Sequence, residues 1–518
     1  MIMKTKLMIL WVMIGTLLAA CYDDKGNYNY EAMNDITITF NERSYSAVLG
    51  EVVKIEPQLS FTIKEDQKAL KFEWSFLGKI ISRDRNLEFK ADTTARDYLM
   101  LRVKDTVTNI VYLAQVPLYI TSPYGARGWM ILSEKDGKSM LSYIREDENE
   151  NEVDGSITYE YIAHPDVYNL VNNEELGTGP IKMLEHFVSN TSNSQFWIMQ
   201  KGGNGCIDID GITYHKDVAM KDMFLDNDLP ANFEPINMLD MRWITFVVNQ
   251  DGKIYTRKKT TDKLFNSGLF LNRPLTFEGE EIDGRNLIIA PAANMDLTVL
   301  YDRPIDKSRN RFLAVVDINE QEAGDIRHFD VEDYDRDCLP LDDLGDVEVL
   351  HCGYYRTGRW DQGYYAILKD VDGQLYSYDF LVESVDRGDP YAEVTQEELD
   401  LGGVVDGVTP VIFNVMPYDV TPYVLIAKGN VLYMYNRKTG ASLEEYYTFA
   451  DEIVSIDSES KDGTRVGVGL KNGHFFVMNF SRDAVNNLVP KVLYHDPEIS
   501  YGSIVDTRFK VMYGFYWN

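Results

Sequence analysis

The chain has 518 residues, of which 45% are hydrophobic, and its 82 acidic side chains outnumber 51 basic ones for a formal net charge of −31. The apolar share is large enough to bury a core, and the length exceeds what one core ordinarily serves, so two or more domains are expected. The surplus of carboxylates repels nucleic acid and anionic lipid headgroups, which excludes a nucleic-acid-binding protein.

The first twenty residues carry the three regions of a secretory signal. Lys4 and Lys6 precede an apolar run, Leu7–Leu18, which is too short to span a bilayer. Leu18-Ala19-Ala20-Cys21 resembles the bacterial lipobox, in which the cysteine thiol receives acyl chains such as palmitate before cleavage. We therefore predict a signal peptide over residues 1–20 and membrane anchoring through Cys21. The alternative is an ordinary secreted protein in which Cys21 is incidental.

Residues 21–35 are predicted to form the lipidated N-terminus and a polar, flexible tether. Asp23 and Asp24 follow the cysteine closely. Acidic residues in this position resemble a signal for transfer to the outer face of the outer membrane in some Gram-negative groups. We therefore expect an outer-membrane protein that faces the cell exterior rather than the periplasm.

Residues 36–122 are predicted to form an immunoglobulin-like β-sandwich. In short runs between glycine-containing turns, apolar and polar residues alternate there, as they do in half-buried strands. Phe72, Trp74 and Phe76 fall on one face of a strand, and a buried tryptophan on a central strand is typical of sandwiches. The predicted strands are Ile36–Phe40, Val52–Ile55, Phe72–Phe76, Tyr98–Asp105 and Val111–Val116.

Residues 123–518 repeat one unit, in which a glycine-containing turn joins an apolar strand to a strand with aromatic residues. Asp-Gly and Asn-Gly favour tight hairpins because glycine accepts positive φ. Seven such units begin near residues 129, 197, 244, 312, 365, 424 and 466, at spacings that fit propeller blades with insertions. The sequence predicts an all-β, seven-bladed propeller, with a count that could differ by one. Val511–Trp517 is predicted to complete the first blade and close the ring.

Five segments of the chain are distinctive, namely Cys21–Tyr28, Phe72-Glu73-Trp74, Ser122–Ser133, Gly252-Lys253-Ile254-Tyr255 and Leu264–Phe270. They resemble the PKD-like family of lipoproteins, and the resemblance spans nearly the whole chain. It implies a PKD-like sandwich and an accessory role beside an outer-membrane transporter complex that imports glycans or peptides, and it implies no catalytic residue.

The sequence contains no local motif for catalysis or metal binding. The histidines lie too far apart for a helical zinc motif, and neither a Gly-x-Ser-x-Gly elbow nor a phosphate loop occurs. Asp208-Ile209-Asp210-Gly211 and Asp342–Asp346 offer oxygen ligands, but turn chemistry explains them better than calcium. Glu146–Glu152 is predicted to be a solvated loop. We assign no catalytic residue, metal or cofactor, although residues of distant blades could still assemble a site.

Three cysteines remain beyond Cys21, too few for a disulfide scaffold. Cys338 and Cys352 could pair in an oxidising compartment, or these two and Cys206 could be separate buried thiols. The sequence leaves both alternatives open.

The candidate for ligand recognition is a glycine-rich segment, Gly353–Tyr365. Trp360 would offer a flat face to a sugar ring, and Arg356 and Arg359 would offer donors to a peptide carboxylate. The alternative, which aromatic residues at strand spacing favour, is that Tyr354 and the Tyr364-Tyr365 pair pack inside strands and Trp360 fills space between blades.

Three functions are compatible with these features. The first is a non-enzymatic surface module that binds a glycan, a peptide or a component of an outer-membrane transporter complex. The second is a propeller hydrolase or lyase that acts outside the cell, with residues drawn from several blades. The third is a purely structural role at the cell surface.

Overall fold

The computed structural model describes most of the chain after residue 34, in two compact units, Met1–Thr121 and Ser122–Asn518. The predicted signal peptide, Cys21 and most of the tether lie outside the described residues. The described ranges are 35–62, 69–151, 155–187, 194–259, 268–285, 297–319, 321–331, 338–356, 362–382, 389–405, 411–414, 422–440, 442–459 and 463–511.

The first unit consists of strands in two layers around one core. One layer is a five-stranded sheet in the order β2-β9-β8-β5-β6, and the other consists of the pairs β1-β4 and β3-β7. The strands are β1 (Ile36–Thr39), β2 (Tyr45–Val48), β3 (Val52–Ile55), β4 (Gln58–Phe61), β5 (Leu70–Phe76), β6 (Lys79–Ser82), β7 (Leu87–Lys90), β8 (Ala95–Asp105) and β9 (Val111–Thr121).

Trp74 of β5 lies at the centre of the core of this unit. Its ring is fully buried, and its indole N–H donates to Asp84 O at 3.0 Å, so the polar group of the ring is satisfied. Phe72 and Phe76 belong to the same core, as their predicted common face requires. The five predicted strands are therefore confirmed. The structure adds four strands that were not predicted, β2, β4, β6 and β7.

The second unit is built mainly from antiparallel sheets. Its largest sheet has the order β16-β15-β14-β13-β11-β10-β37, with β12 paired to β11, and the single pair Ser139–Gly177 joins its two halves. The sheets β17–β19, β22–β24, β25–β28, β29–β32 and β33–β36 follow along the chain, together with the short pair β20-β21.

The bounds of the elements of the second unit are β10 (Gly128–Lys135), β11 (Lys138–Glu150), β12 (Ile157–His164), α2 (Val167–Asn172), β13 (Gly177–Phe187), β14 (Ser194–Gly203), β15 (Ile207–Asp210), β16 (Lys216–Ala219), η2 (Met220–Met223), η3 (Leu225–Asn227), β17 (Pro235–Asp240), β18 (Ile244–Asn249), β19 (Ile254–Lys258), β20 (Thr276–Phe277), β21 (Glu280–Glu281), β22 (Leu297–Asp302), β23 (Arg311–Val316), β24 (Asp325–Arg327), β25 (Glu348–Arg356), β26 (Gln362–Lys369), β27 (Leu375–Val382), β28 (Ala392–Leu399), β29 (Val411–Asn414), β30 (Tyr423–Lys428), β31 (Val431–Asn436), β32 (Glu444–Thr448), β33 (Ile453–Ser458), β34 (Arg465–Leu470), β35 (Phe475–Asn479), α3 (Arg482–Asn486), β36 (Lys491–Tyr494) and β37 (Ser503–Lys510).

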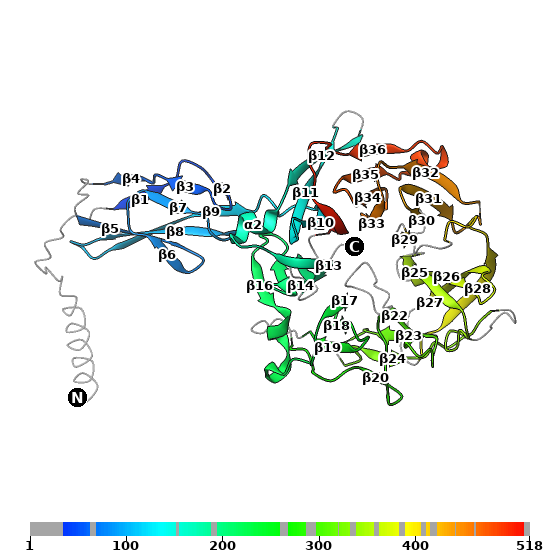
Figure 1. Cartoon of the computed structure of the whole chain (residues 1–518). Coiled ribbons are helices and arrows are strands. Elements are labelled where there is room, and N and C mark those ends of the chain that lie inside the picture. Colours follow the sequence, from blue (N-terminus) through cyan, green and yellow to red (C-terminus); the bar gives the residue numbers. More distant parts are fainter. Residues whose placement is uncertain are drawn as a thin grey trace, which may run out of the picture. The chain divides into compact units, whose positions relative to one another are not determined.

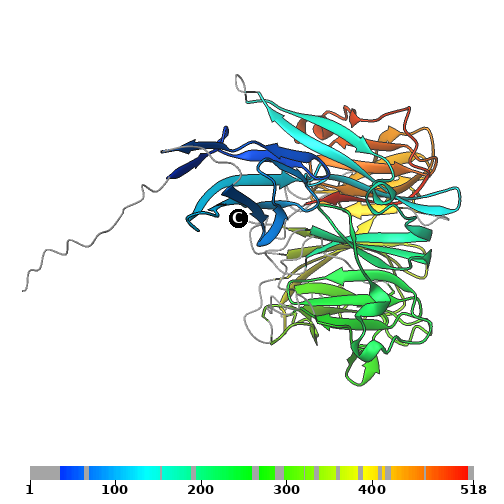
Figure 2. The ribbon, with the colours of Figure 1, turned by 90° about the vertical axis from the view of Figure 1, so that its left-hand side faces the viewer.

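The sheets of the second unit follow one another in chain order around a circle (Figure 1), and the turned view in Figure 2 shows the long β11–β12 hairpin in cyan. The last strand, β37, pairs antiparallel with β10, so that Phe509 lies opposite Trp129. The strand predicted to make this pairing was Val511–Trp517. The structure assigns the pairing to Ser503–Lys510 instead, and residues 512–517 lie outside the described part.

The hairpins predicted from Asp-Gly and Asn-Gly turns are present in the second unit. Gly252 between β18 and β19 and Gly373 between β26 and β27 have φ values of +89° and +91°, which a side chain would disfavour. The seven predicted unit starts fall in β10, β14, β18, β23, β26, β30 and β34. Each of these strands is the second strand counted outward from the centre of the circle.

Within the described part, Cys206 and Cys352 form no disulfide. Cys338 and Cys352 are therefore not joined to each other, which was one of the two predicted alternatives.

Among the residues that the structure describes, none of the helices is long and apolar enough to cross a membrane.

Candidate functional site

Polar side chains gather where the inner strands of neighbouring sheets meet. In Figure 1 the strands β13, β17 and β33 lie nearest the centre of the circle, and β37 contacts both β13 and β33. Four successive inner strands contribute to what we call the inner-strand cluster. Its members are Lys182 (β13), Asn237 (β17), Asp457 (β33), and Asp506 and Arg508 (β37).

The two carboxylates of the cluster fix neighbouring strands to one another. Asp506 Oδ2 accepts a hydrogen bond from the backbone N–H of Met183 at 2.9 Å, which ties β37 to β13. Asp457 Oδ2 accepts one from the backbone N–H of Phe509 at 2.6 Å, which ties β33 to β37. Hydrogen bonds of this kind to a charged acceptor are stronger than neutral ones. The carboxylates therefore have a structural task.

Among the described residues, the two cations of the cluster make fewer hydrogen bonds than they have donors. Lys182 Nζ donates to the neutral amide oxygen of Asn237 at 3.1 Å, and among the described residues it forms no ion pair. Arg508 Nε donates to Asp506 at 3.3 Å, and 26% of its side chain stays exposed. An ammonium and a guanidinium with donors to spare can receive hydroxyl, carbonyl or carboxylate oxygens from a ligand.

Burial sets the ionisation of the cluster. Burial, together with the smaller effect of the positive charge of Arg508, lowers the pKa of Lys182 to about 8, against the opposing effect of Asp506. Burial raises the pKa of Asp457 to about 6, against the opposing effect of Arg508. Groups shifted toward neutral pH in this way are frequent at functional sites, and they also occur in structural networks.

A second buried cluster is saturated by protein groups. Lys259 Nζ donates to Phe187 O at 2.6 Å, Asp240 Oδ2 at 2.7 Å and Met241 O at 2.6 Å, which uses all three of its donors. Asp240 also accepts from the hydroxyl of Thr245 at 2.9 Å. This cluster ties β13, β17 and β19 together and leaves the lysine no donor for a ligand.

His186 and Asp208 form a buried pair beside this second cluster. His186 Nε2 lies 2.8 Å from Asp208 Oδ1, and the imidazole stacks on Trp197 with ring centroids 5.3 Å apart. Burial lowers the pKa of His186 well below its usual range and raises the pKa of Asp208 well above it. Both shifts favour the neutral forms, so the pair acts as a hydrogen bond within the core.

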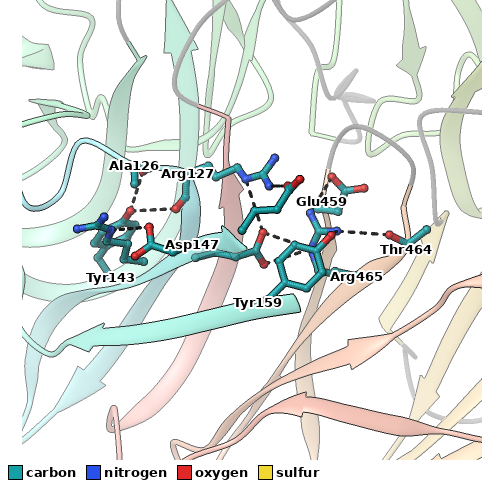
Figure 3. A network of polar contacts seen from close by, with 11 residues as sticks. Ala126, Arg127, Tyr143, Asp147, Tyr159, Glu459, Thr464 and Arg465 are labelled. Carbon is teal, nitrogen blue, oxygen red and sulfur yellow. Dashed lines mark hydrogen bonds and ion pairs between the residues drawn. The ribbon is translucent and has the colours of Figure 1, made fainter. Parts of the chain in front are cut away.

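A third network, which we call the closing network, joins the first and last sheets (Figure 3). Arg465 Nε of β34 lies 3.2 Å from both carboxylate oxygens of Glu146 in β11, and Nη1 of the same guanidinium donates to the hydroxyl of Tyr159 at 2.8 Å. Arg127 and Glu459 complete it, at 3.8 Å from Glu146 and 3.4 Å from Arg465. Its buried position between two sheets indicates a structural role.

The closing network corrects one prediction. Glu146–Glu152 was predicted to be a solvated loop, but β11 extends through Glu150, and Glu146 is only 2% exposed. Residues 148–151 are exposed, as predicted, and Glu152 lies outside the described residues. A run of acidic residues gives no sign that one member faces a buried arginine more than three hundred positions away.

The predicted recognition segment is only partly described. Arg356 ends β25, where it lies opposite Gln362, while Arg359 and Trp360 lie outside the described residues. Tyr354, Tyr364 and Tyr365 are buried, as the packing alternative for these tyrosines expected. Recognition by Arg356, Arg359 and Trp360 stays a prediction.

The acidic turns behave as their turn chemistry predicts. Asp210 Oδ1 accepts hydrogen bonds from the backbone N–H groups of Ile212 and Thr213 at 3.0 and 2.7 Å, and Asp343 Oδ1 accepts from Gly345 at 3.1 Å. Among the described residues, no group of three potential metal ligands comes together.

The sequence patterns did not predict the inner-strand cluster. One signal was present, because Asp506, Arg508 and Lys510 alternate with Thr507 and Phe509, and such alternation predicts a strand. Lys182 gave no such signal, since its partners come from other sheets.

The model of the PKD-like family matches residues 21–180. No curated protein matches the sequence. Among solved structures, a quinonprotein alcohol dehydrogenase-like protein from Bacteroides thetaiotaomicron VPI-5482 is similar over 90% of this chain and 96% of its own, at 13% identity and a TM-score of 0.40. AztD from Citrobacter koseri is similar over 73% of this chain and 83% of its own, at 10% identity and a TM-score of 0.33.

Proposed function

We propose that this chain is a lipid-anchored surface protein whose second unit is a seven-bladed propeller that binds a glycan, a peptide or a transporter component without chemical turnover. In this role it is an accessory of an outer-membrane nutrient uptake complex. The inner-strand cluster is its binding site.

The propeller assignment is supported by the order of the strands. The sheets lie in chain order around a circle, and β37 joins the last part of the chain to the first sheet through β10. Pairing of this kind removes free sheet edges, which is how propellers protect theirs. The seven unit starts of the sequence agree with the two halves of the largest sheet and the five sheets that follow it.

The observation that carries the binding function is the state of the two cations. Lys182 and Arg508 come from distant parts of the chain to adjacent inner strands, and each keeps donors beyond those that the described residues occupy. Lys259, by contrast, is fully occupied by protein acceptors. A binding site needs a few convergent polar groups with free capacity, and the inner-strand cluster meets that need.

The cell-surface location rests on the sequence. The lipobox-like Leu18-Ala19-Ala20-Cys21 supports acylation, and the acidic residues after Cys21 support export to the outer face. The match of residues 21–180 to the PKD-like family is compatible with this placement.

The experiment is protease treatment of intact cells, combined with affinity isolation of the protein from solubilised outer membrane. Cleavage on intact cells and co-isolation of a transporter would support the proposal. Full protection and isolation of the protein alone would contradict the surface and accessory parts of it. A Cys21→Ala variant is the matched control, because it is expected to leave the membrane fraction.

A second candidate function is a hydrolase or lyase, and the specific observation for it is the ionisation of the cluster. A lysine with a pKa of about 8 and an aspartate with a pKa of about 6 could exchange protons near neutral pH. Product formation by the wild type that a Lys182→Met or Asp457→Asn variant loses would favour this function over binding alone.

A further inference from the structure

Among the described residues of the first unit, the five-stranded sheet has a face that no other strand layer covers. On this outer face, side chains that lie opposite one another form rows across β5, β8 and β9. Met100 lies opposite Ser75 and Gln115, and Arg102 lies opposite Glu73 and Leu113. On β8 the intervening residues, such as Leu101, point into the core.

Large apolar side chains cluster on the outer face. Leu113 is 65% exposed and Tyr98 is 54% exposed, and Met100 and Val111 on the same two strands are exposed as well. Ile80 of β6 extends the cluster, since it lies opposite Ser75 in the same row as Met100. Single exposed apolar residues are ordinary on protein surfaces, whereas a contiguous group on one face marks an interaction site.

Basic side chains surround this apolar group. Lys71 and Lys104 lie opposite each other, Arg96 lies opposite Tyr119, and Arg102 is half exposed. Among the described strands, the register places one carboxylate on this face, that of Glu73, which lies 3.6 Å from Arg102. Four cations against one carboxylate make the outer face positive.

This charge contrasts with the rest of the chain. Acidic and basic residues are equally numerous in residues 35–121, so the net charge of −31 belongs to residues 122–518. The expected repulsion of anionic headgroups by the acidic chain therefore does not extend to the first unit. Its outer face can approach an anionic surface that the second unit would avoid.

We propose that the outer face of the first unit binds the surface of an anionic lipid bilayer. Exposed apolar side chains with flanking lysine and arginine are the combination that peripheral membrane surfaces use, in which apolar groups enter the headgroup region and cations meet lipid phosphates. Cys21 precedes Ile36 by fifteen residues. An extended chain of that length reaches at most about 50 Å, so acylation would keep the outer face near the bilayer.

This inference goes beyond the proposed binding function, because it does not depend on any ligand of the inner-strand cluster. The test uses the chain from Tyr22, which keeps both units and lacks the acylated cysteine. The protein is mixed with vesicles of phosphatidylcholine alone or with phosphatidylglycerol, and the bound fraction is measured by flotation. We expect binding to the anionic vesicles that is at least tenfold tighter than to neutral ones and weaker at high salt.

Substitutions locate the binding surface. Tyr98→Ser with Leu113→Ser should reduce vesicle binding at least tenfold, and Lys71→Gln with Lys104→Gln should abolish the preference for anionic lipid. Lys54→Gln is the charge control, because Lys54 is exposed on β3 in the other layer. Val371→Ser in the second unit is the apolar control, since Val371 is 78% exposed.

Circular dichroism confirms that each variant is folded before its binding is compared. Absence of vesicle binding by the wild type, or equal losses in the control variants, would overturn the proposal. Capture of an acidic protein through the outer face without any vesicle binding would also overturn it.

Discussion

Arg465 in β34 and Glu146 in β11 are 319 positions apart, yet the guanidinium Nε lies 3.2 Å from each oxygen of the carboxylate. Both side chains are buried. The pair connects the last four-stranded sheet to the sheet that contains β10 and β37. It therefore reinforces the same junction that the β10–β37 pairing forms through the backbone.

Replacement of Arg465 by Met should destabilise the protein by about 3–5 kcal/mol, because it removes the nearest cation from the buried carboxylate of Glu146 and leaves it Arg127 at 3.8 Å. Urea unfolding followed by fluorescence measures the change. Glu452→Gln is the matched control, since it breaks an exposed ion pair with Lys471 in the same sheet and should cost at most about 1 kcal/mol. Equal losses of stability in the two variants would show that the closing network stabilises the protein no more than an exposed ion pair does.

Gly467 of β34 packs directly against Trp129 of β10, at the same junction. A Cβ atom at Gly467 would lie 2.5 Å from Cζ3 of Trp129, which is closer than nonbonded atoms approach. Gly467→Ala should therefore cost about 1–3 kcal/mol through overpacking. In the Trp129→Leu background the same substitution should cost less, because the smaller side chain leaves room. A thermal or urea series of the four proteins measures this coupling, and strict additivity would contradict the contact.

Asp317 should make stability depend on pH in a defined direction. Burial raises the pKa of this carboxyl from its usual value near 4 to about 8, although the backbone N–H of Trp243 donates to it at 2.8 Å and Lys259 lies nearby. The folded state thus holds a proton that the unfolded state releases. The stabilisation is complete below about pH 4 and is lost as pH rises to about 8.

The Asp317→Asn variant isolates this effect, because the amide resembles the protonated carboxyl. Its stability relative to wild type should rise between pH 5 and pH 8, as measured by urea midpoints at matched ionic strength. A pH-independent difference between the two proteins would contradict the raised pKa.

Cys206 and Cys352 should resist alkylation in the folded protein. Burial raises the pKa of the Cys206 thiol to about 11 and that of Cys352 well above its usual range, so neither supplies thiolate at neutral pH. Iodoacetamide treatment at pH 7.5, followed by mass spectrometry, should label both only after unfolding. Rapid labelling of either cysteine in the native protein would place it at an accessible surface.

Sequence patterns predicted the local parts of this fold well. Gly252 and Gly373 mark hairpins because a tight turn needs positive φ at one position, which is a property of neighbouring residues alone. Phe72, Trp74 and Phe76 mark a buried face because side chains alternate along a strand.

Contacts between distant strands could not be predicted in this way. Val511–Trp517 was predicted to complete the first blade, whereas β37, in which Asp506, Arg508 and Lys510 alternate with other residues, supplies the pairing with β10. The surroundings of Lys182 depend on Asn237 and Asp506, which belong to other strands. A sequence shows such residues as isolated charges, and only the arrangement of the sheets makes them a cluster.

The most direct test of the proposed function is titration of the purified mature protein with a panel of glycans and peptides, with binding heat and product formation followed together. We predict binding without product, with affinity that falls as pH rises through about 8 and Lys182 loses its proton. Binding should be lost in a Lys182→Gln, Arg508→Gln variant that folds normally. Product formation that this variant abolishes, or binding that it leaves unchanged, would contradict the account.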